Sequence, residues 1–129
     1  MPTEFAVTLP DRPGNLARLA QALGDARVNI EAILAVTRDG EGLVRFVPAD
    51  AAVAAHALDE AGFRHTRREV LVARVLDQPG ALGELALVMA TASVNIDTVY
   101  VTTRGYVVLG VDDLQGAIAV AGGMAVMED

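Results

Sequence analysis

The chain of 129 residues has no cysteine and no tryptophan, and its only aromatic side chains are three phenylalanines and two tyrosines. Without cysteine it can form no disulfide, no thiol nucleophile and no cysteine-ligated metal site. The formal charge of −7 argues against a phosphate-binding surface, so we expect no nucleic-acid partner. The sequence also lacks a signal-peptide pattern and the run of roughly 20 apolar residues that a membrane helix needs. We therefore expect a cytoplasmic protein without a membrane partner, with a core of Val, Leu, Ile and Ala.

Motifs for catalysis and for cofactors are also missing. The sequence contains no phosphate-binding loop and no nucleophile elbow. His56 and His65 do not stand at metal-ligand spacing and carboxylates do not cluster around them, so we interpret both as surface or edge residues. We expect no catalytic residue, no cofactor and no metal site. The one basic run, Arg64, Arg67 and Arg68, either forms ion pairs at a solvated edge or docks an acidic partner.

The most informative feature that is present is an internal repeat. Asp77 follows Asp11 by 66 residues, and the same shift relates the two stretches "DRPGNLARLA" and "DQPGALGELA". It also relates "VNIEAI", which begins at Val28, to "VNIDTV", which begins at Val94. One shift kept across both pairs of stretches indicates a duplicated structural unit. We therefore predict two domains, residues 1–68 and residues 69–129.

Both halves have the same predicted order of secondary structure. Phe5, Val7 and Leu9 alternate as in a half-buried strand, and leucines at helical spacing follow the Pro-Gly turn. Two β-branched stretches joined by a turn then predict a hairpin, followed by an alanine-rich helix and a last strand after Gly62 or Gly123. The order β-α-β-β-α-β is typical of a ferredoxin-like α+β fold, with two helices on one face of a four-stranded antiparallel sheet. The expected hairpin strands and second helices are Val28–Thr37, Leu43–Val47 and Asp50–Ala61 in the first half, and Val94–Thr103, Tyr106–Val111 and Asp113–Ala121 in the second.

The Asp-x-Pro-Gly turn connects the first strand to the first helix in each half. Asp11 is a residue type that caps helices by accepting a hydrogen bond from a free backbone N–H. Pro13 suits a first helical turn, and Gly14 leaves the helix start without a side chain in front of its N–H groups. A helix start of this kind attracts anions such as a carboxylate. The alternative is that the turn is only an efficient connection between strand and helix.

Asn29 and Asn95 are the second candidate feature. Each stands 18 residues after the aspartate of its half, where the second strand begins. We expect this strand to return beside the first and to bring the asparagine near the turn. A side-chain amide both donates and accepts hydrogen bonds, so it can bind either end of an amino acid. The alternative is that the asparagine only ends the preceding helix in a left-handed conformation.

Together, Asp-x-Pro-Gly-x-Leu, the spaced leucines and Val-Asn-Ile resemble the ACT domain in both halves, over nearly the whole chain. The resemblance implies small regulatory modules of amino-acid metabolism that pair side by side, often into a continuous eight-stranded sheet. It also implies that an amino acid binds at the domain interface, near the first strand-to-helix loop. The expected ligand-binding residues are Asp11, Arg12, Pro13, Gly14, Asn15, Leu16, Asn29 and Ile30 in the first half, and Asp77, Gln78, Pro79, Gly80, Ala81, Leu82, Asn95 and Ile96 in the second.

Two features depart from the family pattern. Aspartate replaces the usual amide or histidine at the turn, which favours contact with an ammonium group. The residue after the glycine is Asn15 in the first half but Ala81 in the second, so we expect the first turn to be the more polar site.

These observations predict a non-catalytic regulatory protein. We expect it to bind a free amino acid, to form a homodimer through exposed strand edges, and to act on an enzyme or regulator of amino-acid metabolism. The alternative is a dimerisation or partner-docking module without a small-molecule ligand, in which the Pro-Gly turns are architectural.

Overall fold

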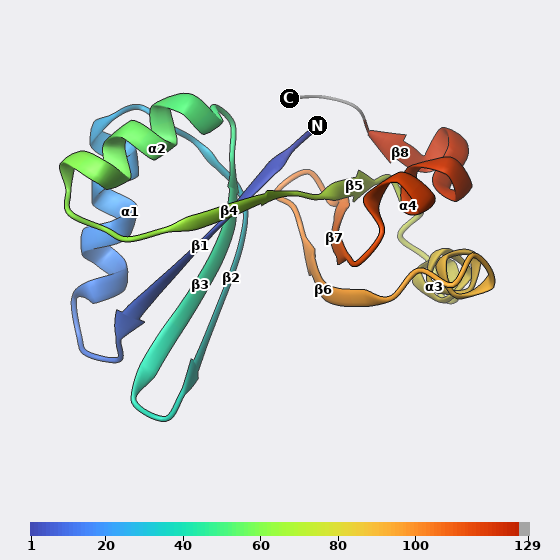
Figure 1. Cartoon of the computed structure of the whole chain (residues 1–129), viewed down its shortest axis with the longest axis horizontal. Helices are drawn as coiled ribbons and strands as arrows, with labels where there is room; N and C mark the ends of the chain where they lie inside the picture. The colour runs from blue at the N-terminus through green and yellow to red at the C-terminus, as the bar shows by residue number, and fades with distance from the viewer. Residues whose placement is uncertain (127–129) are drawn as a thin grey trace. The chain divides into compact units, whose positions relative to one another are not determined.

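The computed structural model describes residues 1–126 of the chain, which divide into two compact units. The first unit comprises Thr3–Arg68, and the second comprises Glu69 onward together with Met1–Pro2. Each unit contains a four-stranded sheet and two α-helices (Figure 1). Among the described residues, no helix is both long and apolar enough to cross a membrane.

The first unit has the predicted β-α-β-β-α-β order. Its strands lie in the order β2-β3-β1-β4, with β3 antiparallel to both β1 and β2. Helices α1 and α2 lie together on one face of this sheet (Figure 1). The elements are β1 (Thr3–Pro10), α1 (Asn15–Asp25), β2 (Ile30–Arg38), β3 (Glu41–Pro48), α2 (Ala51–Glu60) and β4 (Thr66–Glu69).

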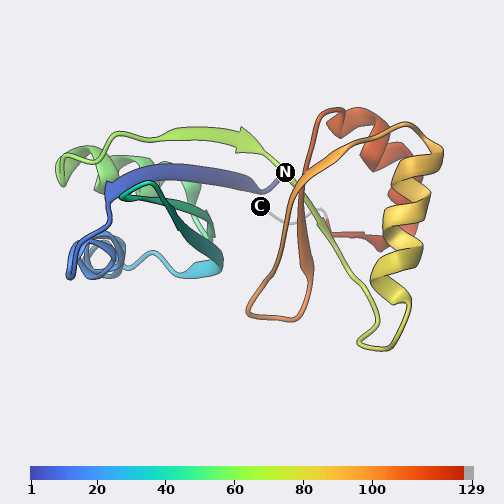
Figure 2. The same cartoon turned by 90° about the horizontal axis from the view of Figure 1, so that it is seen from below.

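The second unit repeats this arrangement. Its strands lie in the equivalent order β6-β7-β5-β8, and both helices again cover one face of the sheet, as Figure 2 shows for the yellow and red helices. The last predicted strand is only two residues long and follows a short 3₁₀ turn, Gly122–Met124. The elements are β5 (Leu71–Ala73), α3 (Ala81–Thr91), β6 (Ile96–Val101), β7 (Val107–Val111), α4 (Leu114–Ala121) and β8 (Ala125–Val126).

The core of each unit lies between the sheet and its helices. The predicted alternation on β1 is confirmed, because Phe5, Val7 and Leu9 are all buried on the helix-covered face. The ring of Phe5 stacks on that of Phe46 in β3, with 5.5 Å between the ring centroids. Leu19 and Leu23 of α1 belong to the same core as these two rings, as their helical spacing predicts.

The opposite face of the first sheet carries a buried carboxylate. The side chain of Glu4 on β1 is fully buried, and its Oε1 accepts hydrogen bonds from Arg45 Nη1 at 3.0 Å and from Arg68 Nε at 2.9 Å. The ion-pair interpretation of the basic run therefore holds for Arg68. Arg67 contributes differently, since its guanidinium lies 5.9 Å from the centroid of the Phe5 ring.

The expected fold is confirmed at the level of each unit. The hydrogen-bonded strands of the described residues form two separate four-stranded sheets and not the continuous eight-stranded sheet that we expected. The predicted second helix starts one residue too early, because Asp50 is the N-cap of α2 and not its first residue.

Candidate ligand-binding site

The turn between β1 and α1 is a type II turn. Asn15 N–H donates to Arg12 O at 3.3 Å, with Pro13 and Gly14 as the central residues. Gly14 has φ 91° and ψ −16°, a conformation that a type II turn requires at this place and that favours glycine. Gly14 is the N-cap of α1, so the prediction that Asp11 caps the helix was wrong. The proline is likewise not in the first helical turn, because the helix begins at Asn15.

The start of α1 is consequently uncapped. No side chain caps it, and its first helical hydrogen bond runs from Arg18 N–H to Gly14 O at 2.9 Å. The N–H groups of Leu16 and Ala17 therefore have no acceptor within the described part of the chain. Unpaired N–H groups at a helix start carry partial positive charge and bind anions.

The second unit reproduces this geometry. Ala81 N–H donates to Gln78 O at 3.3 Å, and Gly80, with φ 88°, is the N-cap of α3 without a capping side chain. The other two helices differ, because Asp50 accepts from Val53 N–H at 3.1 Å at the start of α2, and Asp113 caps α4 in the same way. Within residues 1–126, only the helices that follow a Pro-Gly turn have an uncapped α-helical start.

Polar groups surround the first turn. Asp11 is exposed, and its backbone N–H donates to Gly40 O at 2.9 Å, which ties the turn to the β2–β3 hairpin. That hairpin closes with Asp39 and Gly40 at φ 53° and 78°, as expected of an Asp-Gly type I′ turn. The side-chain amide of Asn15 donates to Pro10 O at 2.7 Å, so part of its polarity is used to hold the turn. Ala81 of the second unit has no such group.

Asn29 does not lie near this turn. Strands β1 and β2 are both antiparallel to β3, so they run in the same direction. Asp11 is level with Gly40, whereas Asn29 accepts a hydrogen bond from Ala49 N–H at 2.9 Å, at the other end of β3. Nine residues of extended chain separate Gly40 from Ala49, which corresponds to about 30 Å. The expectation that one unit brings Asn29 to its own turn is therefore wrong.

The second unit has the same separation. Asn95 O accepts a hydrogen bond from Asp112 N–H at 3.1 Å, just after the C-terminal end of β7. Asp77 follows the C-terminal end of β5, which pairs with Val107 at the N-terminal end of β7. Asn95 and Asp77 therefore lie at opposite ends of the sheet. The exposed side-chain amides of Asn29 and Asn95 make no hydrogen bond to any residue that the structure describes.

The other predicted residues fall into three groups. Leu16 and Leu82 are about half exposed beside the two turns, where they present apolar surface to solvent. Ile30 and Ile96 are partly buried and pack against the cores of their units, so their side chains are structural. Arg12, Pro13, Gln78 and Pro79 form the two turns and are exposed.

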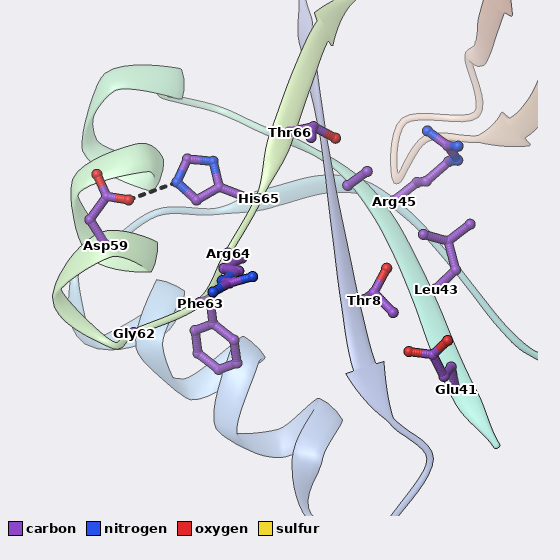
Figure 3. A pocket seen from close by; sticks show the side chains of 11 residues that line it. Thr8, Glu41, Leu43, Arg45, Asp59, Gly62, Phe63, Arg64, His65 and Thr66 are labelled. Atoms are coloured by element: carbon purple, nitrogen blue, oxygen red, sulfur yellow. Dashed lines mark hydrogen bonds and ion pairs between the residues drawn. The ribbon is translucent and has the colours of Figure 1, made fainter.

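A surface cavity of the first unit was not predicted from the sequence. Strand residues such as Thr8, Leu43, Arg45 and Thr66 line it, together with the segment between α2 and β4 (Figure 3). It extends to Glu41, which pairs with Pro10 beside the turn. Residues from three separate segments, 6–8, 41–45 and 59–66, line it, which explains why no sequence motif marked it.

His65 also lines this cavity, directly before the edge strand β4, which agrees with its interpretation as a surface or edge residue. Its side chain is only 15% exposed, and its Nε2 lies 2.8 Å from Asp59 Oδ1, as the dashed line in Figure 3 marks. The imidazole packs on the Phe5 ring, with 5.5 Å between centroids. No group of three or more histidine, aspartate and glutamate side chains within residues 1–126 is arranged to hold a metal ion.

Solved structures share this fold. A protein from Bacteroides thetaiotaomicron is 21% identical, with a TM-score of 0.84 over 92% of this chain and 84% of its own. The regulatory subunit of aspartate kinase from Thermus thermophilus is 17% identical, with a TM-score of 0.72 over 93% and 87%. Aspartate kinase from Synechocystis is 18% identical, with a TM-score of 0.68 over 92% of this chain and 24% of the kinase. No curated protein sequence matches the chain.

A sequence comparison identifies the family of the first unit. Residues 3–62 match the model of the ACT domain, and they comprise β1 to α2 with the two turns described above. The match confirms the resemblance that the Asp-x-Pro-Gly and Val-Asn-Ile motifs indicated. Over residues 3–62 the first unit is therefore similar to ACT domains.

Proposed function

We propose that the chain is a non-catalytic regulatory protein that binds a free amino acid at the β1–α1 turn and a domain interface. The observation that carries this proposal is the contrast among the helix starts. Those of α2 and α4 are capped by aspartates, whereas the ACT-type turns leave the starts of α1 and α3 uncapped and exposed. A binding site for a carboxylate needs such unpaired N–H groups.

The first turn offers complementary groups for both ends of an amino acid. The carboxylate would accept hydrogen bonds from the N–H groups of Leu16 and Ala17. The ammonium group would contact Asp11, whose exposed carboxylate makes no ion pair within residues 1–126. Leu16 supplies apolar surface for the side chain of the ligand.

A second copy of the chain would supply the asparagine. Strand β2 is an edge strand with exposed apolar side chains, Ile33 at 43% and Val36 at 50%, and an exposed edge of this kind invites pairing. If β2 pairs antiparallel with β2 of a second copy, the start of one strand lies beside the end of the other. Asn29 of one copy then approaches the turn of its partner, since that turn is level with the end of β2. The two first units would share one eight-stranded sheet.

The second unit belongs to the same proposal. It repeats the strand order, the uncapped turn and the Val-Asn-Ile motif of the ACT domain, so we assign residues 69–129 to a second ACT domain after a first at residues 1–68. The structural similarity to the regulatory subunit of aspartate kinase supports a regulatory role. A partner that reads the bound state would be an enzyme or regulator of amino-acid metabolism.

Calorimetric titration of the chain with each of the twenty amino acids, one at a time, tests the proposal. We expect saturable binding of at least one of them and a thermal shift of the same selectivity. Asp11→Ala and Asn29→Ala should each abolish it, whereas Asp39→Ala, a nearby exposed acid in the hairpin turn, should not. If all twenty fail to bind, the protein is a docking or dimerisation module and the proposal is wrong.

Mixing the two inactive variants tests whether the site is shared. In a mixed dimer, the Asn29→Ala copy provides an intact turn and the Asp11→Ala copy provides an intact asparagine. One complete site is then present, so binding should return when the two variants are combined and allowed to exchange. A site contained in a single unit cannot be restored in this way.

A further inference from the structure

In each unit the backbone of the asparagine is hydrogen-bonded to the residue before the second helix cap, and we call this place the asparagine corner: Asn29 with Ala49 in the first unit and Asn95 with Asp112 in the second. The two asparagine corners differ in one residue. Ala49 in the first unit and Asp112 in the second occupy equivalent places, because the N–H of each donates to the backbone oxygen of the asparagine, at 2.9 Å and 3.1 Å. Each also directly precedes the aspartate that caps the following helix. The repeat thus compares an alanine with an aspartate at one position of the same corner.

The aspartate changes what the corner offers to a ligand. Asp112 Oδ1 accepts a hydrogen bond from the backbone N–H of Asn95 at 2.9 Å. Ala49 has no acceptor in its side chain, and the N–H of Asn29 has no partner among residues 1–126. The first corner therefore presents a free N–H together with a free side-chain amide, while the second has already bound a carboxylate of its own.

We propose that Asp112 occupies, in the second unit, the place beside the asparagine N–H that one oxygen of the ligand carboxylate takes in the first, where Asn29 of one copy adjoins the Leu16 and Ala17 N–H groups of the other copy. This inference rests on the proposed function and specifies which of the two duplicated sites is used. Two effects exclude a ligand carboxylate from the Asn95 corner. The N–H donor is already paired, and a second negative charge about 4 Å from Asp112 is repelled by about 1 kcal/mol in water and by more in a less polar setting. The chain binds one amino acid, at the site that includes Asn29.

Reciprocal exchange of the two corner residues is the test. Wild-type chain and the variants Ala49→Asp and Asp112→Ala are titrated with each of the twenty amino acids in a calorimeter. Wild type should saturate at one ligand per chain. Ala49→Asp should weaken binding by about 10- to 100-fold, the equivalent of one hydrogen bond to a charged group. Asp112→Ala should raise the stoichiometry to two.

A matched variant separates the corner from added charge in general. Val53→Asp places a carboxylate on the exposed side of α2, one helical turn from the corner, and should bind like wild type. Amide hydrogen exchange gives a readout that needs no ligand. The Asn95 N–H should be protected in wild type and lose that protection in Asp112→Ala, whereas the Asn29 N–H should gain protection in Ala49→Asp.

Several results would overturn the inference while leaving the proposed function intact. They are two ligands per wild-type chain, unchanged affinity in Ala49→Asp, and loss of binding in Asp112→Ala, which would mean that Asp112 holds the ammonium group. Rapid exchange of the Asn95 N–H in wild type would also overturn it. If no amino acid binds to wild type at all, the proposed function fails and the inference fails with it.

Discussion

Removal of the Glu4 side chain should destabilise the first unit strongly. Glu4→Ala leaves Arg45 and Arg68 without the carboxylate that accepts from both, at 3.0 and 2.9 Å. Removal of one partner from a buried ion pair costs about 3–5 kcal/mol. The arginine side chains keep 28% and 33% exposure, so water compensates them in part and the lower end applies, about 3 kcal/mol.

The conservative variant Glu4→Gln gives an internal comparison. Both arginines contact the same oxygen, Oε1, and a glutamine can present a neutral oxygen at that place. It can keep these two hydrogen bonds but loses their charge, so the expected loss is about 1–2 kcal/mol. Glu41→Gln, on the exposed end of β3, should stay within about 0.5 kcal/mol of wild type.

Native-state hydrogen exchange measures these losses within the first unit. A loss of about 3 kcal/mol accelerates exchange of the central β3 amides by about 100-fold, where global unfolding of the unit controls it. Tyrosine fluorescence follows the second unit separately, since both tyrosines, Tyr100 and Tyr106, belong to it. If Glu4→Ala exchanged no faster than Glu41→Gln, the buried carboxylate would not stabilise the fold and the reasoning would be refuted.

Three further substitutions test the elements around the site by chemical denaturation. Gly14→Ala should lower the free energy of unfolding by about 1–2 kcal/mol, because alanine disfavours φ 91°. Gly24→Ala inside α1 should leave it unchanged or raise it, and equal effects of the two substitutions would contradict the turn assignment. Asp50→Ala should cost about 1 kcal/mol through the lost cap on Val53 N–H, and Asp50→Asn should recover most of it. Leu58→Ala, at a fully buried position, should cost about 2–5 kcal/mol, and a loss below 1 kcal/mol would contradict the packing of α2 on the sheet.

The sequence was sufficient for the fold of each unit because its signals are local. Alternation over Phe5–Leu9 identified both the strand and its buried face, and Asp-Gly at residues 39–40 identified the hairpin. Because the sequence is repeated, each inference made for the first half also applied to the second. The burial of Glu4 could not be predicted in this way, because its position in the alternation is that of an ordinary outward-facing charged residue. Its partners Arg45 and Arg68 stand 41 and 64 residues away in the sequence, and only the fold places them beside it.

The candidate site was predicted less well, for two different reasons. Asp11 is a good capping residue by type, but Pro13 and Gly14 form a closed turn between it and the helix, so it cannot reach the free N–H groups in that role. The wrong expectation for Asn29 follows from overlooking the direction of the strands. A strand-helix-strand crossover makes the two strands parallel, so the second strand begins level with the start of the first and far from its end.

Because β1 and β2 are parallel, each unit holds its strand-to-helix turn and its asparagine at opposite ends of its sheet. If the amino acid binds as proposed, neither the turn nor the asparagine of one unit is a complete receptor, and association of two chains creates the receptor. The apparent affinity for the amino acid would then rise with the concentration of the protein itself, because every binding event would stabilise a pairing and every pairing would create binding sites. Synthesis and degradation of the chain would adjust the metabolite level at which it responds, without any change in sequence.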